Sequence, residues 1–278
     1  MDGGAESGAV TFGYRAGAFL GGLAAWGLFE ASWVRLRELD LEVPRLPAEL
    51  DGLRILHLSD FHLGVPSPGA RAVVRGVEWA VERQPDLVCI TGDLLTHPRG
   101  ESRLRELVER LPQPVFAVLG NHDYAVARDP MARASQLREL EPARLLLDEG
   151  ELLDLRGRSV WIAGADPKRS FRRRDANTLS RDADLRILLN HFPRTFDRLE
   201  PDHFDLVLAG HMHDGQITIP YPGGKVRLAH PTARYAAGVY RREGSVMHVS
   251  PGLGTTFVPF RFAARPEVTE LVLRQGYA

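Results

Sequence analysis

Five short apolar runs in this chain each end in a polar cluster rich in aspartate, asparagine and histidine. Short runs of this kind predict strands that are buried on both faces, as in a parallel sheet. The carboxyl ends of such strands meet at one edge of the sheet, where α/β proteins place their active sites. The clusters occupy residues 59–62, 92–93, 120–123, 190–191 and 210–213.

The segments between these runs favour a layered α/β fold. Helical spacing of apolar residues predicts helices over 70–82, 102–111 and 130–141. Shorter apolar stretches over 145–147, 152–155 and 159–163 indicate a second sheet. The last strands are expected in an antiparallel outer sheet or at the far edge of a sandwich, over 216–220, 237–240, 246–250 and 268–273.

The first 50 residues form a separate unit in this interpretation. Residues 1–14 are small and polar, which predicts disorder, and 41–53 carry the proline and Asp-Gly signals of a linker. Between them, 16–34 is an apolar stretch interrupted by Glu30. We expect it to associate with a membrane, either as a short anchor or as an interfacial helix. A signal-like segment and a soluble helix packed on the domain are the alternatives.

The residue types in the five clusters are those of a metal centre without thiolates. Oxygen and imidazole ligands suit Mn, Fe, Zn, Co or Mg, and His-x-His after a glycine is a moderately specific metal signal. Taken singly, Asp93 is more typical of a helix cap or a loop, and an ordinary polar turn is the alternative interpretation of 121–123. Taken together, the set is too large for one tetrahedral ion and suits two ions bridged by a carboxylate. The candidate ligands are Asp60, His62, Asp93, Asn121, His191, His211 and His213.

These motifs, in this order, resemble those of the calcineurin-like metallophosphoesterases. Residues 210–217 and 250–256, with Pro259 and Arg261 after them, are similar to the bacterial branch of YaeI- and YkuE-like phosphodiesterases, which includes UDP-diacylglucosamine pyrophosphatases. We assign 51–278 to this domain and 1–50 to the apolar segment and linker. The resemblance implies a four-layered α/β/β/α sandwich of two mixed sheets flanked by helices.

The resemblance also implies a role for each motif. Asp93 would bridge two divalent ions, Mn²⁺ in the first place, and a bridging hydroxide would attack phosphorus in line. His122 would stabilise the transition state or protonate the leaving oxygen, and Asp123 would orient His122 or its loop. The first ion would be held by Asp60, His62, Asp93 and His213, and the second by Asp93, Asn121, His191 and His211.

A basic run after Asp166-Pro167 is the candidate substrate contact. Lys168, Arg169, Arg172 and Arg173 surround Phe171. Charge runs are usually solvated loops, whereas beside a phosphate-handling site such a loop binds anionic substrate or lipid headgroups. Both interpretations stay open at this point.

The sequence therefore predicts a dinuclear-metal phosphoesterase that hydrolyses phosphodiester or pyrophosphate bonds of a lipid-linked or nucleotide-linked substrate. Two alternatives are a nuclease and a non-catalytic metal-binding scaffold of the same fold. The 35 Lys and Arg nearly balance the 36 Asp and Glu, which argues against a nucleic-acid substrate. An intact His122 beside a full ligand set argues against a scaffold. No protein partner is implied.

Charges around the apolar stretch bear on its orientation. Basic residues follow it at Arg35, Arg37 and Arg45, and Arg15 alone precedes it closely. If the stretch spans a membrane, this asymmetry favours a cytoplasmic catalytic domain. A soluble cytoplasmic protein and an exported one are the alternatives.

Overall fold

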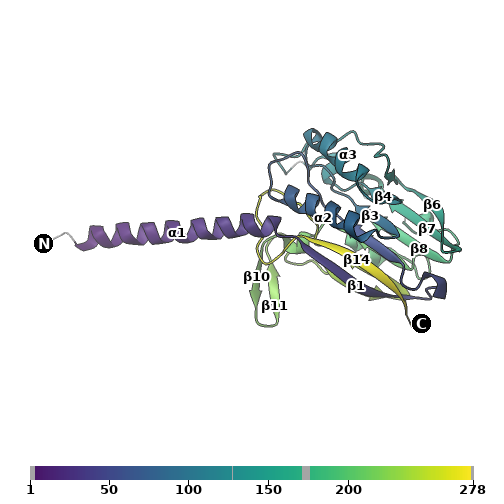
Figure 1. Ribbon diagram of the computed structural model, residues 1–278. Helices are drawn as coiled ribbons and strands as arrows, with labels where there is room; N and C mark the ends of the chain where they lie inside the picture. Colours follow the sequence, from purple (N-terminus) through teal and green to yellow (C-terminus); the bar gives the residue numbers. More distant parts are fainter. Residues whose placement is uncertain (1–3, 127, 171–175, 277–278) are drawn as a thin grey trace.

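In the computed structural model, two six-stranded sheets lie face to face, and a long helix projects from one end of the domain (Figure 1). The structure describes residues 4–126, 128–170 and 176–276. The side chains of 4–16, 169 and 170 are outside this description.

The first sheet is mixed and has the strand order β1-β14-β2-β3-β4-β5. β14 runs antiparallel to β2, and the other neighbours are parallel. The strands are β1 (Arg35–Pro44), β14 (Glu267–Gly276), β2 (Arg54–Leu58), β3 (Leu87–Thr91), β4 (Val115–Val118) and β5 (Arg144–Leu145).

The second sheet is also mixed, with the order β12-β13-β9-β8-β7-β6 and antiparallel pairs at both edges. Its strands are β6 (Glu149–Leu155), β7 (Arg158–Ala165), β8 (Leu185–Asn190), β9 (Leu206–Ala209), β12 (Gly238–Arg242) and β13 (Ser245–Val249). A separate two-stranded hairpin consists of β10 (Thr218–Tyr221) and β11 (Gly224–Arg227).

The described helices are α1 (Gly4–Ser32), α2 (Gly69–Arg83), α3 (Glu101–Glu109) and α4 (Pro167–Ser170). α2 follows the predicted periodicity, because its buried residues repeat at helical spacing along one face. The helix ends at Gln84, whose φ of 48° is left-handed and whose N–H donates to the Ala80 carbonyl.

The core has three parts. Side chains such as Ile55, Phe116, Ile187 and Leu208 fill the space between the two sheets. α2 and α3 cover the outer face of the first sheet. Short 3₁₀ helices at 176–179 and 193–198 contribute to the cover of the second sheet. The predicted class, two mixed sheets with flanking helices, is confirmed, although this last layer is thinner than an α-helical one.

The predicted helix over 130–141 is wrong. Its backbone groups bond outward instead of along a helix: Arg133 N donates to Thr96 O, and Ser135 N donates to Asp123 O. The segment therefore supports the loop of the asparagine–histidine motif. Apolar spacing alone did not distinguish these two uses.

Three expectations for the chain termini also need correction. Residues 4–14 are helical rather than disordered, and residues 1–3 lie outside the described part. The expected linker over 41–53 begins as strand, because β1 pairs with β14 along its whole length. β14, expected in an outer sheet, lies inside the first sheet between β1 and β2.

α1 meets the domain through its last turns. Gly27 packs so closely that a Cβ there would lie 2.6 Å from the Phe262 ring, and Glu30 and Ala31 are buried. Among the described residues, no helix combines the length and the apolarity that crossing a membrane requires.

Candidate metal centre

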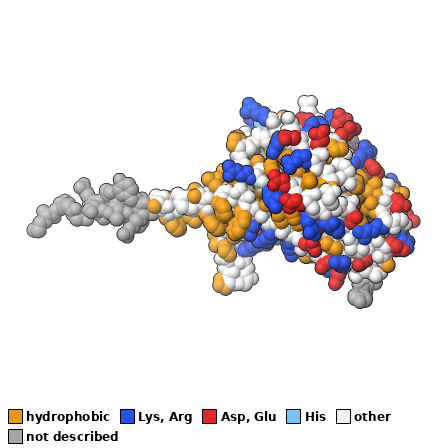
Figure 2. Space-filling view, viewed as in Figure 1, with side chains coloured by type: hydrophobic (Ala, Val, Ile, Leu, Met, Phe, Trp, Pro, Cys, Tyr) orange, Lys and Arg blue, Asp and Glu red, His pale blue; other side chains and the backbone are white. Residues whose placement is uncertain are grey.

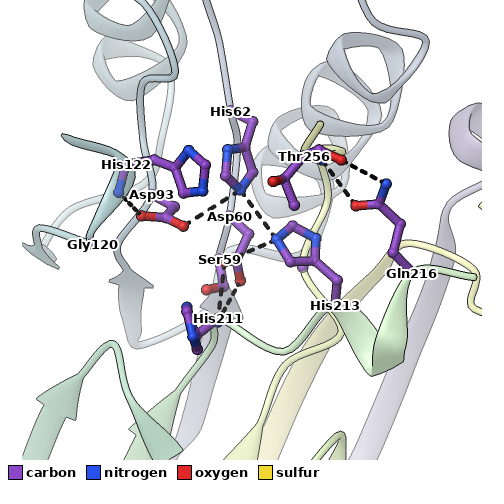
Figure 3. A network of polar contacts seen from close by, with 12 residues as sticks. Ser59, Asp60, His62, Asp93, Gly120, His122, His211, His213, Gln216 and Thr256 are labelled. Atoms are coloured by element: carbon purple, nitrogen blue, oxygen red, sulfur yellow. Dashed lines mark hydrogen bonds and ion pairs between the residues drawn. The ribbon is translucent and has the colours of Figure 1, made fainter. Parts of the chain in front are cut away.

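The predicted ligands meet where the strands of both sheets end (Figure 3). Asp60, Asp93 and Asn121 follow β2, β3 and β4, while His191 and His211 follow β8 and β9. Side chains from both sheets therefore converge on one site, as the strand-then-cluster pattern predicted.

The backbone that presents the ligands is not extended. Asp60, His62, Asp93, His211 and His213 all have φ between 48° and 74°. Asp60 and His62 therefore meet without the extended backbone that would place alternate side chains on one face. Left-handed backbone at non-glycine residues is costly and concentrates at functional sites, where the surrounding structure enforces it.

The first cluster consists of Asp60, His62, Asp93 and His213, all buried. His62 Nε2 lies 3.1 Å from His213 Nε2 and 3.5 Å from Asp93 Oδ2. His213 Nε2 lies 3.5 Å from Asp60 Oδ1. His62 Nδ1 lies 2.9 Å from Thr96 Oγ1, which fixes its ring while Nε2 points into the cluster.

The second cluster consists of Asp93, His191 and His211, with Asn121 beside them. His191 Nε2 lies 3.2 Å from Asp93 Oδ2, 3.1 Å from Asn121 Oδ1 and 3.2 Å from His211 Nδ1. His191 Nδ1 donates to the Thr91 carbonyl at 2.8 Å, so in the neutral ring Nε2 carries a lone pair. That lone pair then faces acceptor atoms of Asp93 and Asn121, an arrangement that a cation stabilises.

The electrostatics of the site indicate the same need for positive charge. Burial opposes charging of His191, yet the Asp93 carboxylate raises the pKa of this imidazole to about 9. Burial lowers the pKa of His62 and of His211 to about 3, which keeps both rings neutral and able to act as ligands. The donor set therefore fits two divalent ions that share Asp93.

His122 lies at the edge of the first cluster and is not part of it. Its ring centroid is 4.7 Å from that of His62, in an edge-to-face arrangement. Its N–H group on the backbone donates to Asp93 Oδ1 at 2.7 Å. Its Nδ1 lies 3.5 Å from Asp129 Oδ2, and both atoms are buried without a hydrogen-bond partner. The Asp129 carboxylate therefore faces this ring nitrogen without a hydrogen bond to it.

Asp123 holds the loop rather than the His122 ring. Its carboxylate accepts hydrogen bonds from the backbone N–H groups of Gly120, Leu94 and Leu95. Burial, with the nearby Asp93 charge, raises its pKa to about 7. Of the two roles expected for this carboxylate, the geometry favours orientation of the loop.

Gly120 and Gly210 allow close approach between the clusters. A Cβ at Gly120 would collide with the Asp93 carboxylate, and one at Gly210 with Ser59 Oγ. Neither glycine has a positive φ, so the close approach and not a left-handed backbone requires glycine here. Both leave room for a neighbouring ligand loop.

Residues 53–215 match the family described as calcineurin-like phosphoesterase, and this stretch includes the seven candidate ligands and His122. The chain belongs to this family. The match covers more than half of the chain and confirms the resemblance drawn from the motifs. This metallophosphoesterase therefore has a buried His/Asp metal site, consistent with a dinuclear centre.

Relatives of this metallophosphoesterase cover most of its length. "Transmembrane protein with metallophosphoesterase domain" of Danio rerio is 32% identical over 91% of the chain, which spans only 61% of that protein. "Uncharacterized metallophosphoesterase YkuE" of Bacillus subtilis is 28% identical over 99% of this chain and 95% of its own. "UDP-2,3-diacylglucosamine pyrophosphatase LpxG" of Chlamydia muridarum is 27% identical over 86% of this chain and 89% of its own.

Sequence reasoning missed a buried arginine beside the metal site of this phosphoesterase. Arg261 Nη2 lies 3.1 Å from His213 Nδ1. Its guanidinium also donates to the carbonyls of Pro251, Gly252, Gly254 and Ala264. Arg261 belongs to the carboxyl-terminal motif, but nothing in that motif indicates a contact with His213. Asp129 and Thr96 were missed entirely, since neither belongs to a recognisable motif.

The predicted substrate-binding run is only partly described. Lys168 is exposed, and its Nζ lies 5.2 Å from the centre of the Tyr124 ring, next to the motif that carries His122. The Arg169 side chain and residues Arg172 and Arg173 lie outside the described part of the chain.

Proposed function

We propose that this chain hydrolyses phosphodiester or pyrophosphate bonds with two divalent metal ions, Mn²⁺ first among Mn, Fe, Zn, Co and Mg. One observation carries the proposal. Asp93 Oδ2 lies 3.5 Å from His62 Nε2 and 3.2 Å from His191 Nε2, so a single carboxylate reaches both ligand clusters. When bound, two such ions activate water and neutralise charge on a phosphoryl group.

In this proposal some residues of the chain bind metal and others act on the substrate or hold the loop. The first ion is held by Asp60, His62, Asp93 and His213, and the second by Asp93, Asn121, His191 and His211. His122 donates a proton to the leaving oxygen from the edge of the first cluster, and Asp129 faces its other ring nitrogen. Asp123 keeps the 120–123 loop in place through three backbone N–H groups.

The test is hydrolysis of bis-p-nitrophenyl phosphate and of p-nitrophenyl phosphate by metal-stripped protein, before and after addition of Mn²⁺, Zn²⁺ or Mg²⁺. We expect metal-dependent cleavage of the diester, reversed by a chelator and restored by the metal. Two bound ions without cleavage of either ester would favour the scaffold. Cleavage of DNA at low salt in preference to the small diester would favour the nuclease.

We propose further that the protein works at a membrane surface on a lipid-linked substrate. Large apolar side chains are exposed on α1, including Phe19, Leu20 and Trp26, and more are exposed on the hairpin (Figure 2). Ile219 and Val226 are cross-strand partners, so with Tyr221 and Leu228 they form one apolar hairpin face. Exposed apolar surface of this extent is typical of a protein or membrane contact.

Flotation with phospholipid vesicles tests the membrane contact. Deletion of residues 1–24 removes Phe19 and Leu20 but leaves Trp26 and the docked Gly27 and Glu30, so the domain should stay folded. The deletion, and separately an Ile219→Asp and Val226→Asp double variant, should each reduce flotation. Full-length protein that stays out of the vesicle fraction would contradict the proposal.

A further inference from the structure

A cavity of about 550 Å³ adjoins the second metal cluster. Its walls come from residues 192–198 after β8, the turn that carries His211, and residues 229–235 after the hairpin. His211 belongs both to the second cluster and to the cavity wall. The cavity is large enough for a substrate group beyond the phosphoryl group on the metals, since small-molecule sites begin near 300 Å³.

Three arginines give this cavity its charge. Arg194, Arg198 and Arg234 line it, and no Asp or Glu is among the lining residues. Arg234 pairs with Asp197 at 2.9 Å. Arg194 and Arg198 form no ion pair among the described residues, so their charge is available to a ligand. We name this site the arginine pocket.

Aromatic rings also line this cavity. Tyr235 and Phe192 contribute aromatic rings, and the Phe192 ring centroid lies 4.6 Å from that of His211. The His230 ring centroid lies 5.7 Å from that of His211. Guanidinium groups beside apolar rings suit a phosphate attached to a larger organic group, because the planar fork of arginine binds phosphate oxygens in pairs.

We propose that the arginine pocket binds a second phosphate of the substrate, next to the phosphoryl group under attack, so that the chain selects diphosphate-linked substrates over simple diesters. This inference rests on the proposed phosphoesterase function and deepens it. Arg194 and Arg198 contact the second phosphate, and the group attached to that phosphate lies against Phe192 and Tyr235.

Two non-hydrolysable probes test the proposal on Mn²⁺-loaded full-length protein. Methylphosphonate offers one phosphoryl group, and methylenediphosphonate offers two in a diphosphate-like arrangement. Calorimetry should show that the diphosphonate binds at least about 10-fold more tightly, as expected for added hydrogen bonds to charged groups. The Arg194→Ala and Arg198→Ala double variant should lose most of this ratio, and both changes are at exposed positions that should not affect folding.

The control variant is Arg71→Ala, which removes an exposed arginine from α2, and the affinity ratio should stay at the wild-type value. Chelation of two metals by the diphosphonate would also give a ratio above one. That ratio would persist in the double variant, and this result would overturn the proposal. Diester hydrolysis is measured separately, so an inactive protein with an arginine-dependent ratio would count against the phosphoesterase function and not against the pocket.

Discussion

The two metal-ligand clusters share Asp93 but differ in how they are enclosed. All four residues of the first cluster are buried, and Thr96 and Arg261 hold two of its imidazoles from behind. In the second cluster Asn121 and His211 are half-buried, and His211 lines the arginine pocket. One side of the centre is therefore enclosed by protein, while the other adjoins a cavity.

The enclosure of the first cluster extends to α1. Arg261 N donates to the Gly27 carbonyl at 3.1 Å, and Ala264 N donates to Glu30 Oε1 at 2.8 Å. Trp26 Nε1 donates to the other Glu30 oxygen at 3.0 Å. The end of the apolar helix therefore belongs to the structure that supports His213.

We expect the largest effect from a variant that changes Asp93, the residue that both clusters share. Asp93→Asn takes a charged ligand from both, so we expect loss of at least one bound metal and a fall in diester turnover of roughly 10³-fold. Metal content by mass spectrometry of the purified variant checks this. His213→Ala and His211→Ala are the matched controls, because each affects one cluster. If Asp93→Asn resembled either of them in metal content and turnover, Asp93 would not bridge.

The second-largest effect is expected from a variant that impairs catalysis and leaves metal binding intact. His122→Ala should lower turnover by about 10²–10⁴-fold, the usual contribution of general acid catalysis, and leave both clusters loaded. Asp129→Asn, which changes the group facing Nδ1, should have a smaller effect in the same direction. Turnover with two bound metals per chain is the measurement. A His122→Ala protein with normal turnover would remove this histidine from the mechanism.

The difference between the clusters was only partly predictable from sequence. Strand runs and the residues that follow them predicted that the seven candidate ligands meet at one site, because parallel strands bring their carboxyl ends together. The support of His213 by Arg261 was not predictable, since it depends on how a loop 48 residues away along the chain folds back. The left-handed backbone at Asp60 and His62 is likewise a product of tertiary structure, and local patterns favour an extended segment there.

Arg261→Met should affect the first cluster alone. Loss of a partner behind a metal-binding histidine typically weakens metal affinity 10–100-fold. The change also leaves several buried carbonyls without donors, so we expect unfolding to become easier by on the order of 2–5 kcal/mol. Arg265→Met is the control, because Arg265 stacks on Trp33 and bonds to carbonyls of 33 and 34 without touching His213. Metal titration well below the melting temperature separates the two effects, and equal loss at both clusters would contradict the proposed asymmetry.

The smallest expected effect concerns the protonation of two buried histidines that join the two sheets. His57 of β2 and His248 of β13 join the two sheets through their Nδ1 atoms, 2.8 Å apart. Thr91 Oγ1 donates to Ser59, so it accepts from His57 Nε2, and His248 therefore supplies the shared proton. Both rings are neutral: burial lowers the pKa of His248 to about 3 and, with the neighbouring ring, holds that of His57 well below its usual value.

This pair predicts how stability depends on pH. In the unfolded chain both histidines take up protons near pH 6.5, while in the folded chain they stay neutral, so stability is complete above pH 6.5 and falls as the pH decreases. Each histidine contributes a slope of up to about 1.4 kcal/mol per pH unit. His248→Asn keeps a donor for His57 but removes one titrating group, so its urea unfolding should be less sensitive to acid between pH 6.5 and 5. The measurements are made with saturating Mn²⁺ so that the cluster ligands do not titrate. If the unfolding free energies of variant and wild type fell in parallel as the pH decreases, the acid sensitivity would belong to the metal centre and not to His57 and His248.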